Sequence, residues 1–193
     1  MKNHLSLAAI AIAVTACSQE STAPEADTTT AETSSNADAV EIALVDPLDS
    51  TTNEYCLDIA GGRESVDPAN GLQGHTCYSY TGSLGSDQIF DASRIADNVL
   101  VMPEYDVCVS VSGTDISLAA CDDSEAQKIS FGEDGTIRPA ASPEMCLTLA
   151  ADTRSGKSDV HQIKGLSVES CSDESAARQM WRTRNSDDTP SDG

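Results

Sequence analysis

Three short segments of the chain share one pattern, and this repetition limits the fold more than any other feature of the sequence. Each segment is a cysteine followed by an apolar, a polar and an apolar residue, at Cys56–Ile59, Cys108–Val111 and Cys146–Leu149. This alternation is the period of a strand that is buried on one face. A motif that recurs along a chain is typical of folds built from stacked or radially arranged units. The sequence therefore predicts three related β units.

Each motif is followed by a second cysteine, and then by a glutamine two positions before a large apolar side chain. The second cysteines are Cys77, Cys121 and Cys171, and the glutamine segments are Gln88–Phe90, Gln127–Ile129 and Gln179–Trp181. Gln88 lies 20 residues before Cys108, and Gln127 lies 19 residues before Cys146. The length variation thus falls between the two cysteines of each unit, as expected when insertions are confined to one loop per repeat.

The rest of the sequence between residues 54 and 184 favours an all-β domain. No long amphipathic helix is evident, and short apolar runs alternate with turn-forming clusters such as Gly61-Gly62 and residues 132–135. Such alternation of apolar runs and turn clusters is typical of β structure. The length suits one domain.

The repeated pattern resembles the ricin B-type lectin family, whose fold is a β-trefoil. The best local match runs from Gln127 to Arg138 and continues at Cys146-Leu147. Members of that family commonly have Gln-x-Trp, then Asp-Gly-Thr-Ile-Arg, then Cys-Leu. The resemblance covers residues 54–184 with all three repeats. It implies a single all-β β-trefoil of three repeats, each with an internal disulfide, behind a disordered N-terminal tether.

The resemblance also gives structural roles to the repeated residues. Six cysteines can pair in many ways, and the repeat selects Cys56–Cys77, Cys108–Cys121 and Cys146–Cys171. Thiolate metal binding is the alternative, but the spacing is not Cys-x-x-Cys and the compartment is expected to be oxidising. In the family, the glutamine satisfies backbone groups and the aromatic residue fills the shared core. The core positions here are Phe90, Ile129 and Trp181.

The resemblance places a sugar site in the first repeat. Sugar hydroxyls need polar partners, and the C–H face of a sugar packs on an apolar or aromatic plate. In the family, a carboxylate follows the first cysteine by two residues, a plate precedes the second cysteine by two, and an Asn-Gln pair precedes the core aromatic residue. The first repeat has Asp58, His75 and the pair Asp87-Gln88 at these positions. These are the expected ligand-binding residues.

The other two repeats lack both the aspartate and the aromatic plate. Their corresponding residues are Ser110, Ala119 and Ala126-Gln127 in the second repeat, and Thr148, Glu169 and Arg178-Gln179 in the third. These repeats are expected to act as scaffold. Two plainer interpretations of the first repeat stay open. Asp58 could be a turn aspartate that binds backbone amides ahead of Gly61-Gly62, and His75 could be an exposed loop residue.

The N-terminus has the pattern of a bacterial export signal. Lys2 precedes the nearly all-apolar run Leu5–Val14, which is too short for a membrane-spanning helix of roughly 20 residues. Val14–Cys17 resembles the lipobox of bacterial lipoproteins. We therefore expect residues 1–16 to be removed and Cys17 to receive the lipid; an ordinary signal peptide with an incidental cysteine is the alternative. Setting Cys17 aside leaves six of the seven cysteines to pair.

The residues after the signal are expected to form a tether. Residues 17–53 are expected to comprise the lipidated cysteine and a flexible acidic linker, because residues 18–53 contain eight acids, no base and no aromatic residue. Val40–Val45 is the exception and could pack on the domain as a short strand. Residues 185–193 are expected to be a disordered tail. Ser18 follows the cysteine, which in a Gram-negative host indicates lipid anchoring at the outer membrane of the cell envelope.

Charge and missing motifs exclude several functions. Without the signal peptide the chain has 10 basic and 32 acidic side chains, a net charge of −22, so nucleic acid is not an expected partner. The sequence contains no catalytic triad, zinc-protease motif or phosphate loop. We therefore do not expect the protein to be an enzyme or to bind a cofactor or a metal. The expected function is a membrane-anchored carbohydrate-binding lipoprotein without catalytic activity. Its partners would be a polysaccharide or glycan, and the membrane through the lipid on Cys17. The alternative is a structural or protein-binding envelope lipoprotein whose trefoil has lost its sugar sites.

Overall fold

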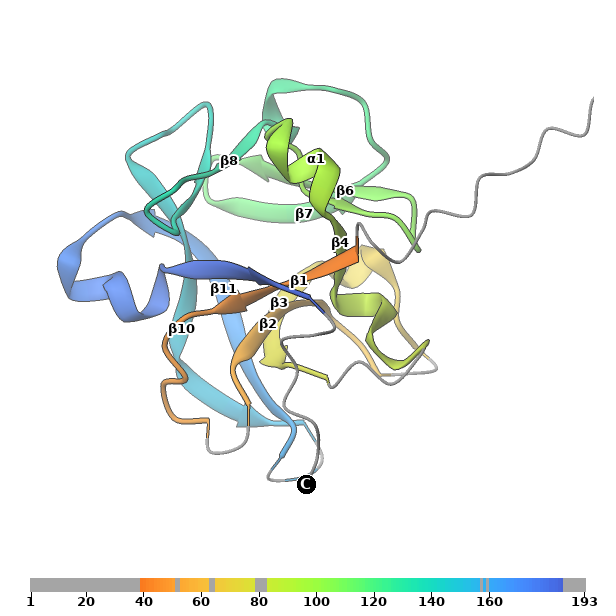
Figure 1. The fold of residues 1–193 in the computed structure, drawn as a ribbon, viewed down its shortest axis with the longest axis vertical. Helices are drawn as coiled ribbons and strands as arrows, with labels where there is room; N and C mark the ends of the chain where they lie inside the picture. The colour runs from red at the N-terminus through yellow and green to blue at the C-terminus, as the bar shows by residue number, and fades with distance from the viewer. Residues whose placement is uncertain are drawn as a thin grey trace, which may run out of the picture. The chain divides into compact units, whose positions relative to one another are not determined.

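The computed structural model of the chain is a β structure (Figure 1). It describes residues 39–50, 53–62, 65–78, 83–156, 158 and 160–185. The α-helix of this part, α1 (Ala92–Ala96), is five residues long. None of its helices has the length and apolar character needed to cross a membrane. The expected signal peptide, Cys17, most of the expected linker and the tail after Asn185 lie outside the described residues.

The strands follow the threefold pattern of a β-trefoil, which confirms the predicted fold class. Each repeat has four strands, and the second and third of these form a hairpin. The first repeat has β1 (Ala39–Leu44), β2 (Tyr55–Ile59), β3 (Leu72–Thr76) and β4 (Ile89–Asp91). The second has β5 (Val101–Met102), β6 (Val107–Ser112), β7 (Asp115–Ala119) and β8 (Ile129–Phe131). The third has β9 (Ile137–Pro139), β10 (Met145–Ser155), β11 (Gln162–Ser170) and β12 (Trp181–Arg184).

Short 3-10 helices stand at equivalent places in the three repeats. One precedes the fourth strand of each repeat: η3 (Ser83–Gln88), η4 (Glu125–Gln127) and η5 (Asp173–Arg178). A further one, η2 (Pro68–Asn70), precedes β3. Its N-cap is Asp67, whose carboxylate accepts a hydrogen bond from the backbone N–H of Ala69 at 2.9 Å. Each repeat therefore makes its last turn just before the strand that enters the core.

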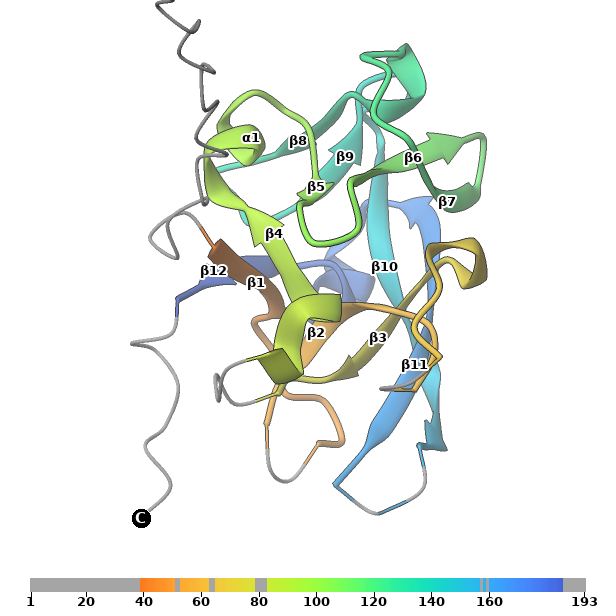
Figure 2. The ribbon, with the colours of Figure 1, turned by 90° about the vertical axis from the view of Figure 1, so that its right-hand side faces the viewer.

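The strand β1 closes the largest sheet, whose order is β10-β11-β3-β2-β1-β12, with β4 also paired to β1 (Figure 2). Ile42 and Leu44 of β1 are fully buried. From the sequence, Val40–Val45 was expected only as a strand within the linker that could pack on the domain. In the structure the strand joins the first repeat to the third, so the folded part begins before residue 54.

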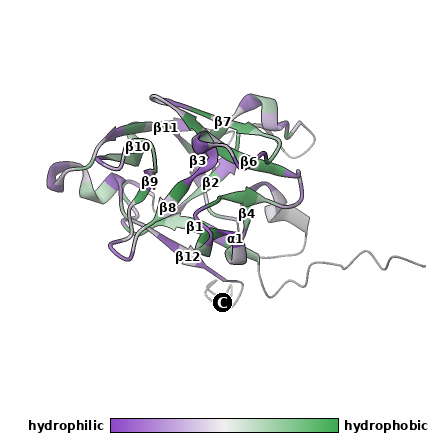
Figure 3. Ribbon diagram, turned by 90° about the horizontal axis from the view of Figure 1, so that it is seen from above, coloured by the Kyte–Doolittle hydropathy of each residue, from purple (hydrophilic) through white to green (hydrophobic). Residues whose placement is uncertain are grey.

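The three positions that follow the glutamines meet in one apolar cluster. Phe90, Ile129 and Trp181 are all buried and lie in the same cluster as Leu57 and Leu147. Figure 3 shows apolar segments on the strands and hydrophilic segments in the loops around them. A small apolar hollow is lined by Leu100, Val109, Val111, Ile129, Ile137, Pro139, Leu147 and Val168. Ile129, whose side chain is smaller than the rings of Phe90 and Trp181, is one of the residues that line this hollow.

Three disulfides join the two cysteines of each repeat, which confirms the pairing selected from the repeat. They are Cys56–Cys77, Cys108–Cys121 and Cys146–Cys171, with Cα–Cα distances of 4.9, 5.1 and 5.0 Å. Each bridge links the strand that carries the cysteine motif to a cysteine one or two residues after the end of the strand that pairs with it in the hairpin.

The repeated glutamines hold the backbone on both sides of the second cysteine. Their Oε1 atoms accept from the backbone N–H of Tyr78 (2.9 Å), Asp122 (2.9 Å) and Ser172 (3.1 Å). Their Nε2 atoms donate to the carbonyls of Thr76 (3.4 Å), Ala120 (2.9 Å) and Ser170 (3.0 Å). This double contact needs a side chain that carries both a hydrogen-bond donor and an acceptor at its end. The amide group of glutamine has both.

Candidate functional site

The first repeat contains a buried polar cluster around Asp58. Asp58 lies on β2 and is 1% exposed. Its Oδ1 accepts from Nε2 of Gln73 at 2.8 Å, and its Oδ2 accepts from Nε2 of Gln88 at 3.1 Å. Asp58 therefore contacts two side-chain amides from within a strand, which differs from the turn interpretation. The structure brings together the predicted residues Asp58 and Gln88.

Gln73 belongs to this cluster and was not identified from the sequence. It lies on β3, directly opposite Asp58 in the antiparallel ladder. It also lies two positions before His75, so both side chains lie on the same face of the strand. This spacing could have identified Gln73 from the sequence. If His75 is a site residue on a strand, the residue two positions before it lies on the same face of that strand.

Burial dominates the electrostatics of this cluster. It raises the pKa of Asp58 to about 8, against the hydrogen bonds from Gln73 and Gln88. The predicted site residue Asp87 is buried as well, burial raises its pKa, and its charge adds to the rise at Asp58. A carboxyl group with a raised pKa stays protonated to a higher pH than an exposed carboxyl group does.

His75 lies beside the cluster in a group of three rings. It is 5% exposed and lies on β3, which differs from the exposed-loop interpretation. Its ring centroid is 5.0 Å from that of Tyr78 and 5.5 Å from that of His161. Burial lowers the pKa of His75, so the ring is neutral at pH 7. Nδ1 then donates to the carbonyl of Thr76 at 2.8 Å, which leaves Nε2 as an acceptor.

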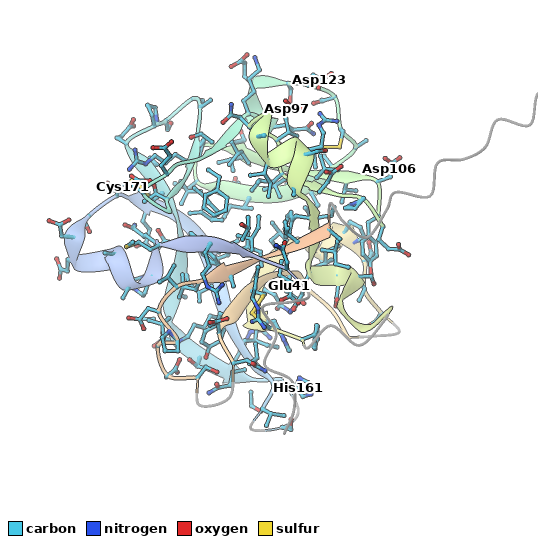
Figure 4. All side chains as sticks on the ribbon, viewed as in Figure 1. Glu41, Asp97, Asp106, Asp123, His161 and Cys171 are labelled. Carbon is cyan, nitrogen blue, oxygen red and sulfur yellow. A yellow bond between two sulfur atoms is a disulfide. The ribbon has the colours of Figure 1, made fainter. Side chains whose placement is uncertain are left out.

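A hairpin from the third repeat lies against this part of the first repeat. Its strands β10 and β11 are the two longest of the described fold, and β11 pairs with β3 through Ile163 opposite His75. The close approach depends on Gly74, because a Cβ at this position would lie 2.2 Å from Cδ1 of Leu149. Figure 4 labels His161, which lies near the end of this hairpin. The hairpin places Arg154 beside Gln73, whose Oε1 accepts from Nη2 at 2.9 Å.

A buried lysine fastens the hairpin to the first repeat. Lys164 of β11 is 1% exposed, and its Nζ lies 3.0 Å from the carboxylate of Asp49 and 5.2 Å from the centre of the Tyr55 ring. Burial works to raise the pKa of Asp49, but hydrogen bonds from Thr153, Lys164 and Tyr55 outweigh it and lower the pKa to about 2. The carboxylate is therefore charged at all ordinary pH values.

The corresponding positions of the other repeats are filled by contacts of the chain itself. Ser110 faces Ser117 across the hairpin of the second repeat, and Ala119 is exposed. In the third repeat, Nη1 of Arg178 donates to the carbonyl of Leu149 at 2.8 Å, and Nη2 lies 3.8 Å from Glu169. Neither repeat places a carboxylate at the position of Asp58.

One group of described side chains has the composition of a metal site but does not suit one. Potential ligand atoms of Glu41, Cys56 and Cys77 lie within 4.8 Å of one another. Both sulfurs are bound to each other in a disulfide, so neither is a thiolate that could bind a metal. Glu41 (labelled in Figure 4) instead faces Arg184, with 3.6 Å between its Oε2 and Nε.

Comparison with known proteins relates the chain to β-trefoil lectin domains. Residues 99–191 match the family model described as the ricin-type beta-trefoil lectin domain. The match covers the second and third repeats, and the cluster around Asp58 lies before it. No curated protein matches the chain significantly.

Solved structures share the fold at low sequence identity. The solution structure of the mdaA-1 domain is 15% identical with a TM-score of 0.54, and the match covers 76% of this chain and 89% of that one. The Haemophilus ducreyi cytolethal distending toxin is 15% identical with a TM-score of 0.51, covering 77% and 83%. A mutant C-terminal domain of an earthworm lectin, in complex with 6'-sialyllactose, is 17% identical with a TM-score of 0.50, covering 76% and 97%. At these identities the likeness concerns the fold.

Proposed function

Starting from a β-trefoil that is similar to ricin-type lectin domains, we propose that this protein binds carbohydrate at its first repeat and has no catalytic activity. The observation that carries the proposal is the cluster of Asp58, Gln73 and Gln88 beside the rings of His75 and Tyr78. Polar groups with fixed orientation next to aromatic rings are what a sugar requires. The first repeat is the one in which the described residues place a carboxylate within such a cluster.

Asp58 would act on the sugar by holding other groups. It is 1% exposed, so a sugar bound to this conformation meets the half-buried rings of Tyr78 and His161 before it meets the carboxylate. Asp58 fixes the amide of Gln73, which in turn fixes Arg154. A single shallow site of this kind would bind with a dissociation constant on the order of millimolar, about 4 kcal/mol.

The same burial favours a second candidate function. In that case Asp58 and the two amides that it holds only stabilise the fold. The protein would then be a structural or protein-binding component of the cell envelope. The two functions differ in whether the purified protein binds any glycan.

We predict that Asp58→Ala removes detectable glycan binding while the fold survives. The variant loses the acceptor that orients the amide of Gln73, and the loss of a hydrogen bond costs about 0.5–1.5 kcal/mol, a large share of the affinity of a weak site. Glycans bound on an array by the purified protein would be titrated against the variant by NMR. Ser110→Ala, at the matching position of the second repeat, should bind like the wild type. Undiminished binding by Asp58→Ala would place the site elsewhere, and the absence of any bound glycan would favour the structural function.

We further propose that the protein is a lipoprotein anchored through Cys17, with its destination at the outer membrane. The three bridges use six of the seven cysteines, which leaves Cys17 as the one outside them. Several acyl chains at about 0.8 kcal/mol per buried methylene would give durable anchoring. Metabolic labelling with palmitate should mark the wild type, and Cys17→Ala should carry no label. An unlabelled wild type would refute the anchor.

A further inference from the structure

Arg154 differs from every other cation in the described part of the chain, because it has no carboxylate partner there. The other lysines and arginines of that part all form ion pairs: Arg94–Asp97, Lys128–Glu125, Arg138–Asp134, Lys164–Asp49, Arg178–Glu169, Arg182–Glu54 and Arg184 with Glu41 and Glu54. The chain has 32 acidic and only 11 basic side chains. In such a chain an arginine without an acid beside it is unusual.

Arg154 is also held in one orientation at the first-repeat site. Its Nη2 donates to Oε1 of Gln73 at 2.9 Å, and Nε2 of Gln73 donates to Asp58 at 2.8 Å. The residue is exposed, so the rest of its guanidinium group can be reached from solvent. A guanidinium group has five N–H donors, and the contact with Gln73 uses one.

The rings of the same site lie beside this guanidinium group. The centroids of Tyr78 and His161 are 6.2 Å apart, and that of His75 lies within 5.5 Å of both. Arg154 lies opposite Ile163 in the hairpin, and Ile163 in turn lies opposite His75, so the two side chains stand on neighbouring positions of one sheet. His75 and Tyr78 come from the first repeat, while Arg154 and His161 come from the hairpin of the third. The site is therefore built by both repeats.

We propose that this composite site takes saccharides that carry a carboxylate, such as uronic-acid units, with Arg154 pairing with the carboxylate and the rings packing on the sugar. This inference rests on the proposed function and specifies its ligand class. Guanidinium groups bind carboxylates through two parallel hydrogen bonds, a contact that a neutral sugar does not make. Elsewhere the acidic surface of the chain repels anions, so an arginine with no carboxylate partner among the described residues gives this site its selectivity.

Paired ligands test the inference directly. Uronic-acid oligosaccharides and sialylated glycans are printed on an array, each beside its methyl ester, which has the same sugar without the charge. We expect the acids to bind about tenfold more tightly than their esters, since a charge-assisted contact is lost. This preference should weaken as salt is added. Equal binding of the acids and their esters would overturn the proposal.

Variants of the purified protein locate the preference. Arg154→Gln should bind the acids and the esters alike, whereas Lys128→Gln, which removes one exposed charge from the second repeat, should keep the preference of the wild type. Retention of the preference by Arg154→Gln would overturn the proposal. If only neutral glycans bind, and Asp58→Ala abolishes that binding, the ligand class is wrong while the carbohydrate function stands. If no glycan binds, both proposals fall.

Discussion

Reduction of the three disulfides is expected to unfold the domain at room temperature or to leave it only marginally stable. The bridges close loops of 21, 13 and 25 residues. Each contributes about 3 kcal/mol in the chain-entropy description, and roughly 9 kcal/mol is of the order of the whole stability of a domain. Circular dichroism melts with and without a phosphine reductant measure the effect. An unchanged melting temperature after complete reduction, verified by thiol counting, would contradict the expectation.

Removal of single bridges gives the matched comparison. Cys146→Ala with Cys171→Ala opens the longest loop, and Cys108→Ala with Cys121→Ala opens the shortest. The first pair should cost more stability than the second, though by less than about 1 kcal/mol, because the entropy of loop closure grows only slowly with length. A reversed order would mean that local packing outweighs loop length.

The second large effect is a loss of stability as the pH rises from about 4 to about 8. Burial raises the pKa of Asp58 to about 8 and that of Glu41 to about 7, although Arg184 opposes the rise at Glu41. A group with a raised pKa binds its proton more tightly in the folded state, so its stabilising contribution is present at acid pH and is lost as the pH rises through the folded pKa. Each group contributes up to about 1.4 kcal/mol per pH unit within its window, or several kcal/mol in total.

Further groups with shifted pKa values shape the same profile. The lowered pKa of Asp49 gives stability that is present above pH 4 and is lost towards pH 2, so the maximum should fall near pH 4–5. The lowered pKa of His75 acts in the opposite direction to Asp58, but its effect is complete once the pH passes the ordinary histidine value of 6.5. The raised pKa of Asp87 acts in the same direction as that of Asp58. The interval from pH 7 to 8 therefore reports on Asp58 and Asp87, together with the end of the Glu41 titration.

Denaturant melts at several pH values test this prediction. The free energy of unfolding of Asp58→Asn should decline less between pH 7 and 8 than that of the wild type. This expectation concerns the slope and does not depend on the absolute stability of the variant. Asp115→Asn, which changes an exposed aspartate on the edge strand β7, should keep the slope of the wild type. A wild-type protein whose stability is constant or rises from pH 5 to 8 would show that Asp58 is ionised in the folded state.

The sequence predicted the fold because the motifs that define a trefoil are local. A cysteine motif, a second cysteine and a glutamine before Phe90 or Trp181 each lie within one repeat, and the structure uses them in that way. The strand β1 was harder to place. Its partners β4 and β12 lie far along the chain. The acidic composition of the residues before it made the segment look like part of the linker.

The site was only partly predictable, because it is completed by long-range pairing. The resemblance to ricin-type lectins predicted Asp58 and His75 from their spacing to the cysteines, and Asp87-Gln88 from their position before Phe90. Spacing within one repeat says nothing about a hairpin from another. Pairing of β11 with β3 brings Arg154 and His161 to the candidate site. The sequence showed that the third repeat has the longest interval between its cysteines, without showing where that extra length would lie.

An NMR titration of the isotope-labelled protein with its best array ligand tests the central claim most directly. If the first repeat binds the sugar, the amide signals that shift should come from residues 73–78 on β3 and its end, and from Arg154 and 161–163 on the facing hairpin. Signals of the hairpin β6–β7 should stay in place, because the second repeat has no carboxylate at the corresponding position. Shifts confined to the second repeat or to η5, with residues 73–78 unmoved at saturation, would contradict the account.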